Sequence, residues 1–137
     1  MWIGISKKFK PETILKALQS YFNSEYVKLL NDMSELNMEY ECFEIDHNSS
    51  EFPLVISYIK SSEVDIYYEC MKIAKYISVQ LNCNTICDGS NEGDDESPYW
   101  SIIWKKGNSF LADDCGTKFA DNEGGEVKIV RMINIEI

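Results

Sequence analysis

The sequence is poor in positive charge and has no long apolar run. Its 137 residues hold 23 acidic and 13 basic side chains, a formal net charge of −10, and Arg131 is the only arginine. An acidic excess of this size repels phosphate backbones, which disfavours direct nucleic-acid binding and favours a cationic protein partner. No apolar stretch approaches the roughly 20 residues of a membrane span, and the apolar run over 1–5 is too short for the apolar region of a secretory signal. We therefore expect a cytoplasmic protein that makes no contact with membranes.

Metal-binding motifs are also missing. Cys83 and Cys87 lack the two-residue spacing of zinc ribbons and have no matching second pair. The stretch 88–96 resembles a calcium loop only faintly, because Tyr99 stands where the loop needs a bidentate glutamate. We expect no metal site and no cofactor, and we expect the five cysteines to be reduced and mostly buried.

Catalytic motifs are equally scarce. No glycine-rich phosphate loop follows a strand. A cysteine nucleophile would need Cys115 together with His47, the only histidine, but Asp113 and Asp114 beside Cys115 oppose a thiolate there. The sequence therefore indicates no catalytic residue, and we expect that the protein is not an enzyme.

The apolar pattern predicts a single α+β domain over 1–137. Pro11 opens a helix whose apolar stripe continues to Met33, with Asn23-Ser24 dividing it into two helices. A capping box from Ser62 to Asp65 precedes a second long helix over 66–81. Strands are predicted over 2–6, 39–46, 52–59, 84–87, 99–105, 109–112 and 127–137.

This order of elements resembles a ferredoxin-like β-α-β-β-α-β sandwich with an additional C-terminal hairpin and strand. The resemblance implies a mainly antiparallel sheet with two main helices packed on it.

Acidic side chains are concentrated in the last third of the chain. Residues 88–126 hold ten acids and three bases, a net charge of −7 over 39 residues. If the loops of this region gather at one end of the sheet, they form a negative surface beside three aromatic side chains that supply contact area. The predicted partner-binding residues are Asp88, Glu92, Asp94, Asp95, Glu96, Tyr99, Trp100, Trp104, Asp113, Asp114, Asp121 and Glu123.

Two interpretations of this region remain open. The acids either dock a cationic partner or form solvated loops above a core that contains the tryptophans. Arg131, within a run of β-branched residues, either faces solvent or pairs with a carboxylate.

A small, acidic, α+β chain without a catalytic motif resembles the immunity proteins of bacterial toxin–immunity pairs, such as those of contact-dependent growth inhibition. That resemblance implies a one-to-one complex with a cognate toxin domain, often a basic nuclease, whose active site is covered. Two alternatives are a small enzyme whose site is assembled from distant residues and an adaptor subunit that adds a strand through 127–137.

Overall fold

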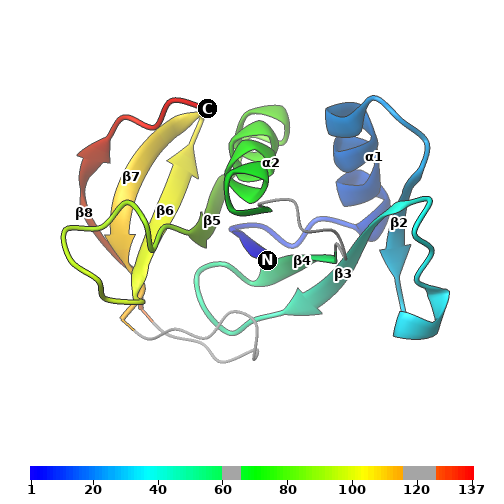
Figure 1. The fold of residues 1–137 in the computed structure, drawn as a ribbon, viewed down its shortest axis with the longest axis horizontal. Helices are drawn as coiled ribbons and strands as arrows, with labels where there is room; N and C mark the ends of the chain where they lie inside the picture. Colours follow the sequence, from blue (N-terminus) through cyan, green and yellow to red (C-terminus); the bar gives the residue numbers. More distant parts are fainter. Residues whose placement is uncertain (60–65, 116–125) are drawn as a thin grey trace.

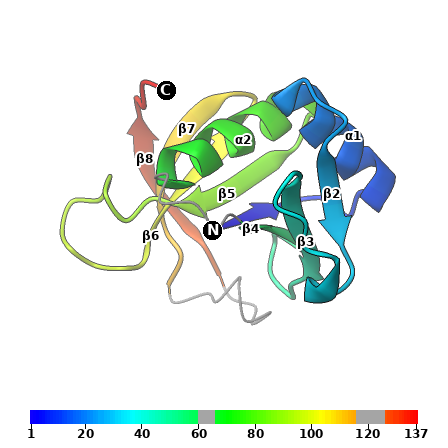
Figure 2. The ribbon, with the colours of Figure 1, turned by 45° about the vertical axis from the view of Figure 1, so that its right-hand side comes forward.

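The computed structural model describes residues 1–59, 66–115 and 126–137. They form an eight-stranded sheet in the order β2-β3-β4-β1-β5-β6-β7-β8, with both α-helices on one face (Figures 1 and 2). Neighbouring strands are antiparallel except for the parallel pair β2 and β3. The strands are β1 (Trp2–Ile5), β2 (Val27–Leu30), β3 (Glu41–His47), β4 (Leu54–Ile59), β5 (Asn84–Asp88), β6 (Trp100–Lys105), β7 (Asn108–Asp113) and β8 (Lys128–Ile133).

The predicted α+β class is confirmed. Helix α1 (Pro11–Phe22) connects β1 to the β2–β3 end of the sheet. Helix α2 (Ile66–Gln80) connects β4 to β5. The central order β3-β4-β1-β5, with these two helices as crossovers, is that of the ferredoxin-like sandwich. β2 extends this core at one edge and β6, β7 and β8 extend it at the other (Figure 1).

The chain after α1 differs from the prediction. Pro11 opens α1 as expected, but Asn23 adopts a left-handed conformation (φ 50°) and its N–H bonds to the carbonyls of Gln19 and Ser20, which ends the helix. The predicted second helix is wrong: the chain continues as β2, which buries Val27 and Leu30, and then as the short 3₁₀-helix η1 (Met33–Glu35). A short apolar run fits the spacing of a helix and that of a strand equally well. Here the hydrogen bonds to β3 make residues 27–30 a strand.

The second helix follows its predicted stripe. Ile73, Ala74 and Ile77 are buried against the sheet, and the hydroxyl of Thr85 donates to the carbonyl oxygen of Ala74 at 2.7 Å. The predicted capping box at 62–65 lies outside the described residues. Neither described α-helix combines the length and apolar character needed to cross a bilayer.

The last strand is shorter than predicted. β8 ends at Ile133, and residues 134–137 turn back over the helix-bearing face toward α2 (Figure 1). Ile133 and Ile135 are half-buried against the main core. The tail therefore covers part of the sheet that the two helices leave open.

Both faces of the sheet bury apolar side chains. The main core lies beneath the helices and includes Phe43, Met71 and Trp104. A smaller cluster on the opposite face centres on Phe52, which packs over Gly4, where an added Cβ would lie 3.1 Å from the Cβ of Phe52 and 2.6 Å from Ile86. This close approach requires glycine in β1.

Thiol labelling offers a direct check of this core. All five cysteines are free, and Cys115 alone is exposed. Burial raises the pKa of Cys70 to about 12 and that of Cys83 to about 11, so the thiolate is scarce at neutral pH. In the native protein we expect one thiol to react with a maleimide within minutes and four to react only after denaturant is added. A Cys115→Ser variant should lose the fast label; rapid labelling of two or more thiols would contradict this packing.

Candidate partner-binding surface

The acidic loop, defined here as residues 89–99, connects β5 to β6 and lies at the β8 end of the sheet (Figure 1). Its ends are joined because the N–H of Gly89 donates to the carbonyl of Trp100 at 3.1 Å. Asp88 accepts the N–H of Ser90 at 3.0 Å, which turns the chain out of β5. Asp88 is therefore occupied in shaping the loop.

Trp100 fixes the middle of the loop. Its ring lies directly on Gly93, where an added Cβ would come within 1.9 Å of it. Its indole N–H donates to Asp95 at 2.8 Å, and the same carboxylate oxygen accepts the N–H of Ser97 at 2.9 Å. Trp100 is half-buried and also packs against the main core.

Arg131 holds the outer part of the loop. Its guanidinium forms a bidentate ion pair with Asp94, with N–O distances of 2.7 and 2.5 Å between residues 37 positions apart. The guanidinium holds the pKa of Asp94 below its usual range, and the carboxylate raises the pKa of Arg131. Both possibilities for the lone arginine are observed, because its side chain is 47% exposed on β8 and also pairs with a carboxylate.

The inner part of the loop is attached to α2. The hydroxyl of Tyr67 donates to the carboxylate of Glu92 and accepts the N–H of Asn91 at 3.1 Å. Burial and the neighbouring Glu92 raise the pKa of Tyr67 well above its usual range, which keeps it protonated. The acidic loop is thus attached to α2, β6 and β8 and is preorganised.

Two predicted contact residues are buried. Trp104 is 1% exposed in the main core, and the ammonium of Lys75 lies 5.7 Å from the centre of its ring. Asp114 is 7% exposed and accepts a hydrogen bond from the hydroxyl of Ser101 at 3.1 Å. The alternation of side chains along β6 places Trp104 on the face beneath the helices. Because both Trp104 and Asp114 are buried, neither belongs to the predicted partner-binding surface.

The other predicted residues are distributed as follows. Asp94, Asp95, Glu96 and Tyr99 are exposed, whereas Asp88, Glu92, Trp100 and Asp113 are partly buried. No partner for Glu96 is found among the described residues. Asp121 and Glu123 lie outside the described residues. The structure brings together the residues of the acidic loop and places Asp113 at the end of β7, opposite Trp100.

The ion pair between Arg131 and Asp94, called the loop clamp here, gives a testable prediction. Replacing Arg131 with methionine is expected to accelerate amide hydrogen exchange over 91–96 while leaving thermal stability almost unchanged, because the ion pair is exposed. Mass-spectrometric exchange measures both the loop and the core. Lys128→Met, on the same strand, is the matched control; equal exchange in both variants would contradict the clamp.

Acid should loosen the same contact. Because the pKa of Asp94 is depressed in the folded protein, the ion pair contributes above the ordinary carboxyl pKa of about 3.9 and is lost as pH falls through the lower folded value. In the R131M variant, the rate of amide hydrogen exchange in the loop should no longer change with pH in that range, once the intrinsic pH dependence of exchange has been subtracted. A persisting response would assign it to another group.

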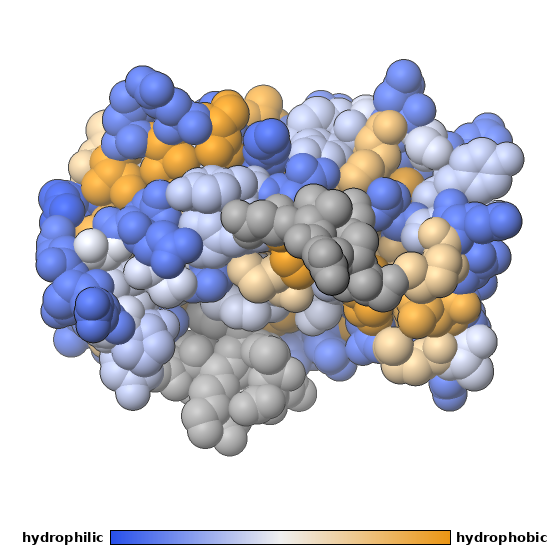
Figure 3. Space-filling model, in the orientation of Figure 1, coloured by the Kyte–Doolittle hydropathy of each residue, from blue (hydrophilic) through white to orange (hydrophobic). Residues whose placement is uncertain are grey.

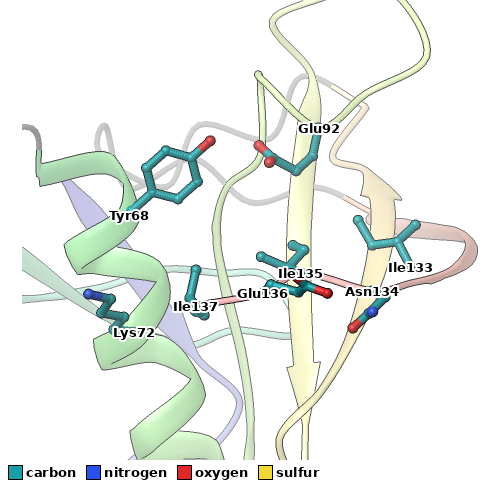
Figure 4. Close-up of a pocket in the computed structure, with 8 residues that line it drawn as sticks. All are labelled: Tyr68, Lys72, Glu92, Ile133, Asn134, Ile135, Glu136 and Ile137. Carbon is teal, nitrogen blue, oxygen red and sulfur yellow. The ribbon is translucent and has the colours of Figure 1, made fainter.

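A groove adjoins the acidic loop. It measures about 690 Å³ and lies between α2 and the C-terminal tail (Figure 4). Tyr68 and Lys72 line it from the helix, Glu92 from the loop, and residues 133–137 from the tail. Its mixed lining holds one cation, Lys72, and two carboxylates, Glu92 and Glu136, and includes no cysteine, serine or histidine.

The residues of the alternative cysteine–histidine site, His47 and Cys115, do not line the groove beside the acidic loop or three further grooves formed by described residues. His47 is exposed on β3, and Cys115 is exposed just after β7. Partial desolvation and the Asp113 carboxylate, which accepts the Cys115 N–H at 2.8 Å, raise the pKa of the Cys115 thiol. This environment disfavours the thiolate, as the sequence indicated.

The faint calcium loop is occupied by protein contacts. Asp88 and Glu92 bind Ser90 and Tyr67 rather than facing a common point. Within 1–59, 66–115 and 126–137, no group of three or more His, Cys, Asp or Glu side chains is placed to hold a metal ion.

Sequence reasoning overlooked a second acidic region. Residues 25–46 contain seven acids and one base, a net charge of −6 over 22 residues, which is a denser excess than that of 88–126. The acidic excess was visible in the composition, but a predicted helix that ended at Met33 and a predicted strand over 39–46 gave no indication of an exposed apolar surface in this segment.

Comparisons with known proteins add no further constraint. No protein-family model matches the chain, and neither a curated protein nor a solved structure shows significant similarity to it.

Proposed function

We propose that this protein is a cytoplasmic immunity protein that binds and neutralises a cationic toxin domain through its acidic loop. The observation that supports this most is the preorganised acidic loop of a chain with a net charge of −10. A loop that is already ordered loses little conformational entropy on binding, and its exposed acids attract a cationic partner over long range.

The partner's chemistry follows from this charge. A nuclease must be positive where it grips phosphate, so carboxylates presented at that place compete with its substrate. Asp95 and Glu96 are exposed for such a contact, and Tyr99, which is 51% exposed, supplies apolar area. Asp94 reaches the partner with its charge partly compensated by Arg131.

Co-expression tests the proposal. The product of the reading frame immediately upstream in the native genome is expressed with and without this protein, and growth of the host is followed. We expect the upstream product to stop growth and this protein to restore it, with a one-to-one complex on size-exclusion chromatography. An upstream product that does not inhibit growth, or inhibition that this protein leaves unchanged, would argue against the immunity function.

A second candidate function rests on β8. This strand ends the described sheet, and Ile129, Val130 and Met132 are 43%, 49% and 65% exposed on it. An edge strand with exposed apolar residues is a template for strand addition, as in an adaptor subunit. Val130→Lys with Met132→Lys should abolish partner binding if the strand is used and leave it unchanged if the acidic loop is used.

A further inference from the structure

A second exposed surface lies at the opposite end of the sheet from the acidic loop. We define the β2–η1 patch as Tyr26, Met33, Leu36 and Met38, which are 60%, 51%, 38% and 65% exposed. Four exposed large apolar side chains within 13 residues form a concentration of the kind that marks interaction sites. Figure 3 shows apolar atoms gathered at this end, over β2 and the segment that follows it.

Polar contacts hold the patch in its exposed arrangement. Asp32 accepts the N–H of Ser34 at 2.8 Å and begins η1, and Asn37 accepts the N–H of Glu39 at 3.0 Å. The ammonium of Lys28 donates to the carbonyl of Glu35 at 2.9 Å. These polar side chains satisfy the backbone of the segment while its apolar side chains face outward, so the exposure belongs to the folded form.

Aromatic contacts connect the two arms of the segment. The rings of Tyr26 and Tyr40 meet edge to face at 5.4 Å, and the N–H of Glu41 donates to the carbonyl of Tyr26 at 2.9 Å. Lys28 lies 5.8 Å from the centre of the Tyr40 ring. The segment that carries the patch is therefore anchored at both ends to the paired strands β2 and β3.

The charge around the patch selects its occupant. Glu25, Asp32 and Glu39 are exposed beside it, and Lys28, the only base of 25–46, is directed to Glu35 and Tyr40. A second copy of this chain would place the same acids against one another across a two-fold axis. A cationic segment meets the opposite sign, and methionine side chains adapt to varied apolar partners.

We infer that the β2–η1 patch docks a cationic, amphipathic segment of a protein partner. Leucine-like side chains of that segment cover Tyr26, Met33 and Leu36, while its lysines and arginines meet the surrounding carboxylates. This inference stands apart from the proposed function, because it concerns residues at the other end of the molecule and does not require a toxin.

The test uses a synthetic helical peptide with leucines on one face and lysines on the other. Titrated into the ¹⁵N-labelled full-length protein, it should shift the amide signals of 25–41. Met33→Ser with Leu36→Ser should weaken binding about tenfold or more, since buried anchors carry most of the energy. The matched control is Tyr68→Ser with Val79→Ser, which removes similarly exposed side chains from α2 and should bind as the wild type does.

Three results would overturn the inference. The first is that the signal shifts are confined to 89–99. The second is that a peptide of the same composition in scrambled order binds equally well. The third is that the protein associates with itself and that Met33→Ser with Leu36→Ser abolishes this self-association. Glu25→Gln with Glu39→Gln should weaken binding and reduce its salt dependence. Because the peptide is not a toxin, failure here leaves the co-expression result of the proposed function unaffected.

Discussion

Neutralising Asp94, Asp95 and Glu96 together, as Asp→Asn and Glu→Gln, is expected to slow association with the cationic partner about tenfold at low ionic strength. The asparagines keep an oxygen that accepts the indole N–H of Trp100, so the loop retains its main internal bond. The triple change weakens the long-range attraction, which salt screens within about 10 Å at 0.1 M, and it also removes the charge of Asp94 from its ion pair with Arg131. The dissociation rate should change less than the association rate.

The control variant carries the same net charge. Glu12→Gln, Asp46→Asn and Glu51→Gln remove three exposed acids that lie outside the acidic loop. Stopped-flow association at several salt concentrations compares the two variants, and Glu96→Gln alone separates charge from loop structure. Equal slowing of both triple variants would show that net charge acts without a docking site. Unchanged association rates in both variants would show that electrostatic steering plays no part in binding.

Replacing Trp104 with alanine is expected to lower the free energy of unfolding by about 3–5 kcal/mol. The side chain is 1% exposed beneath α2, and its removal leaves a cavity in the main core that the rigid sheet closes only partly. Since small domains are stable by about 5–15 kcal/mol, this variant should be near the limit of folding at 37 °C.

Urea unfolding measures the loss, with Tyr99→Ala as the control. Tyr99 is 51% exposed, and its replacement should change stability by less than about 0.5 kcal/mol. The conservative Trp104→Phe should fold and bind the partner normally. If a stable Trp104→Phe protein bound the partner weakly, Trp104 would contribute to partner binding after all.

Most of the sheet follows from local patterns. Two β-rich runs on either side of Lys106-Gly107-Asn108 predicted the hairpin of β6 and β7, where Lys106 and Gly107 both take positive φ. β2 was missed because its four residues are too short for a distinctive period and its partner, β3, is joined to it in parallel across the intervening segment.

The site was less predictable than the fold. Composition located the acids, but it did not reveal that Asp94 pairs with Arg131 or that Glu92 binds Tyr67, because these contacts join residues far apart in the chain. Trp100 and Trp104 share a face of β6, and only their positions relative to α2 and Gly93 make one a loop support and the other a core residue.

We propose the preorganised acidic loop as the docking surface for a cationic partner. Hydrogen exchange of this protein alone and in complex with the upstream gene product tests it most directly. We expect the amides whose exchange slows on binding to centre on 89–99. A complex in which these amides exchange as in the free protein, while β8 or another surface becomes protected, would contradict it.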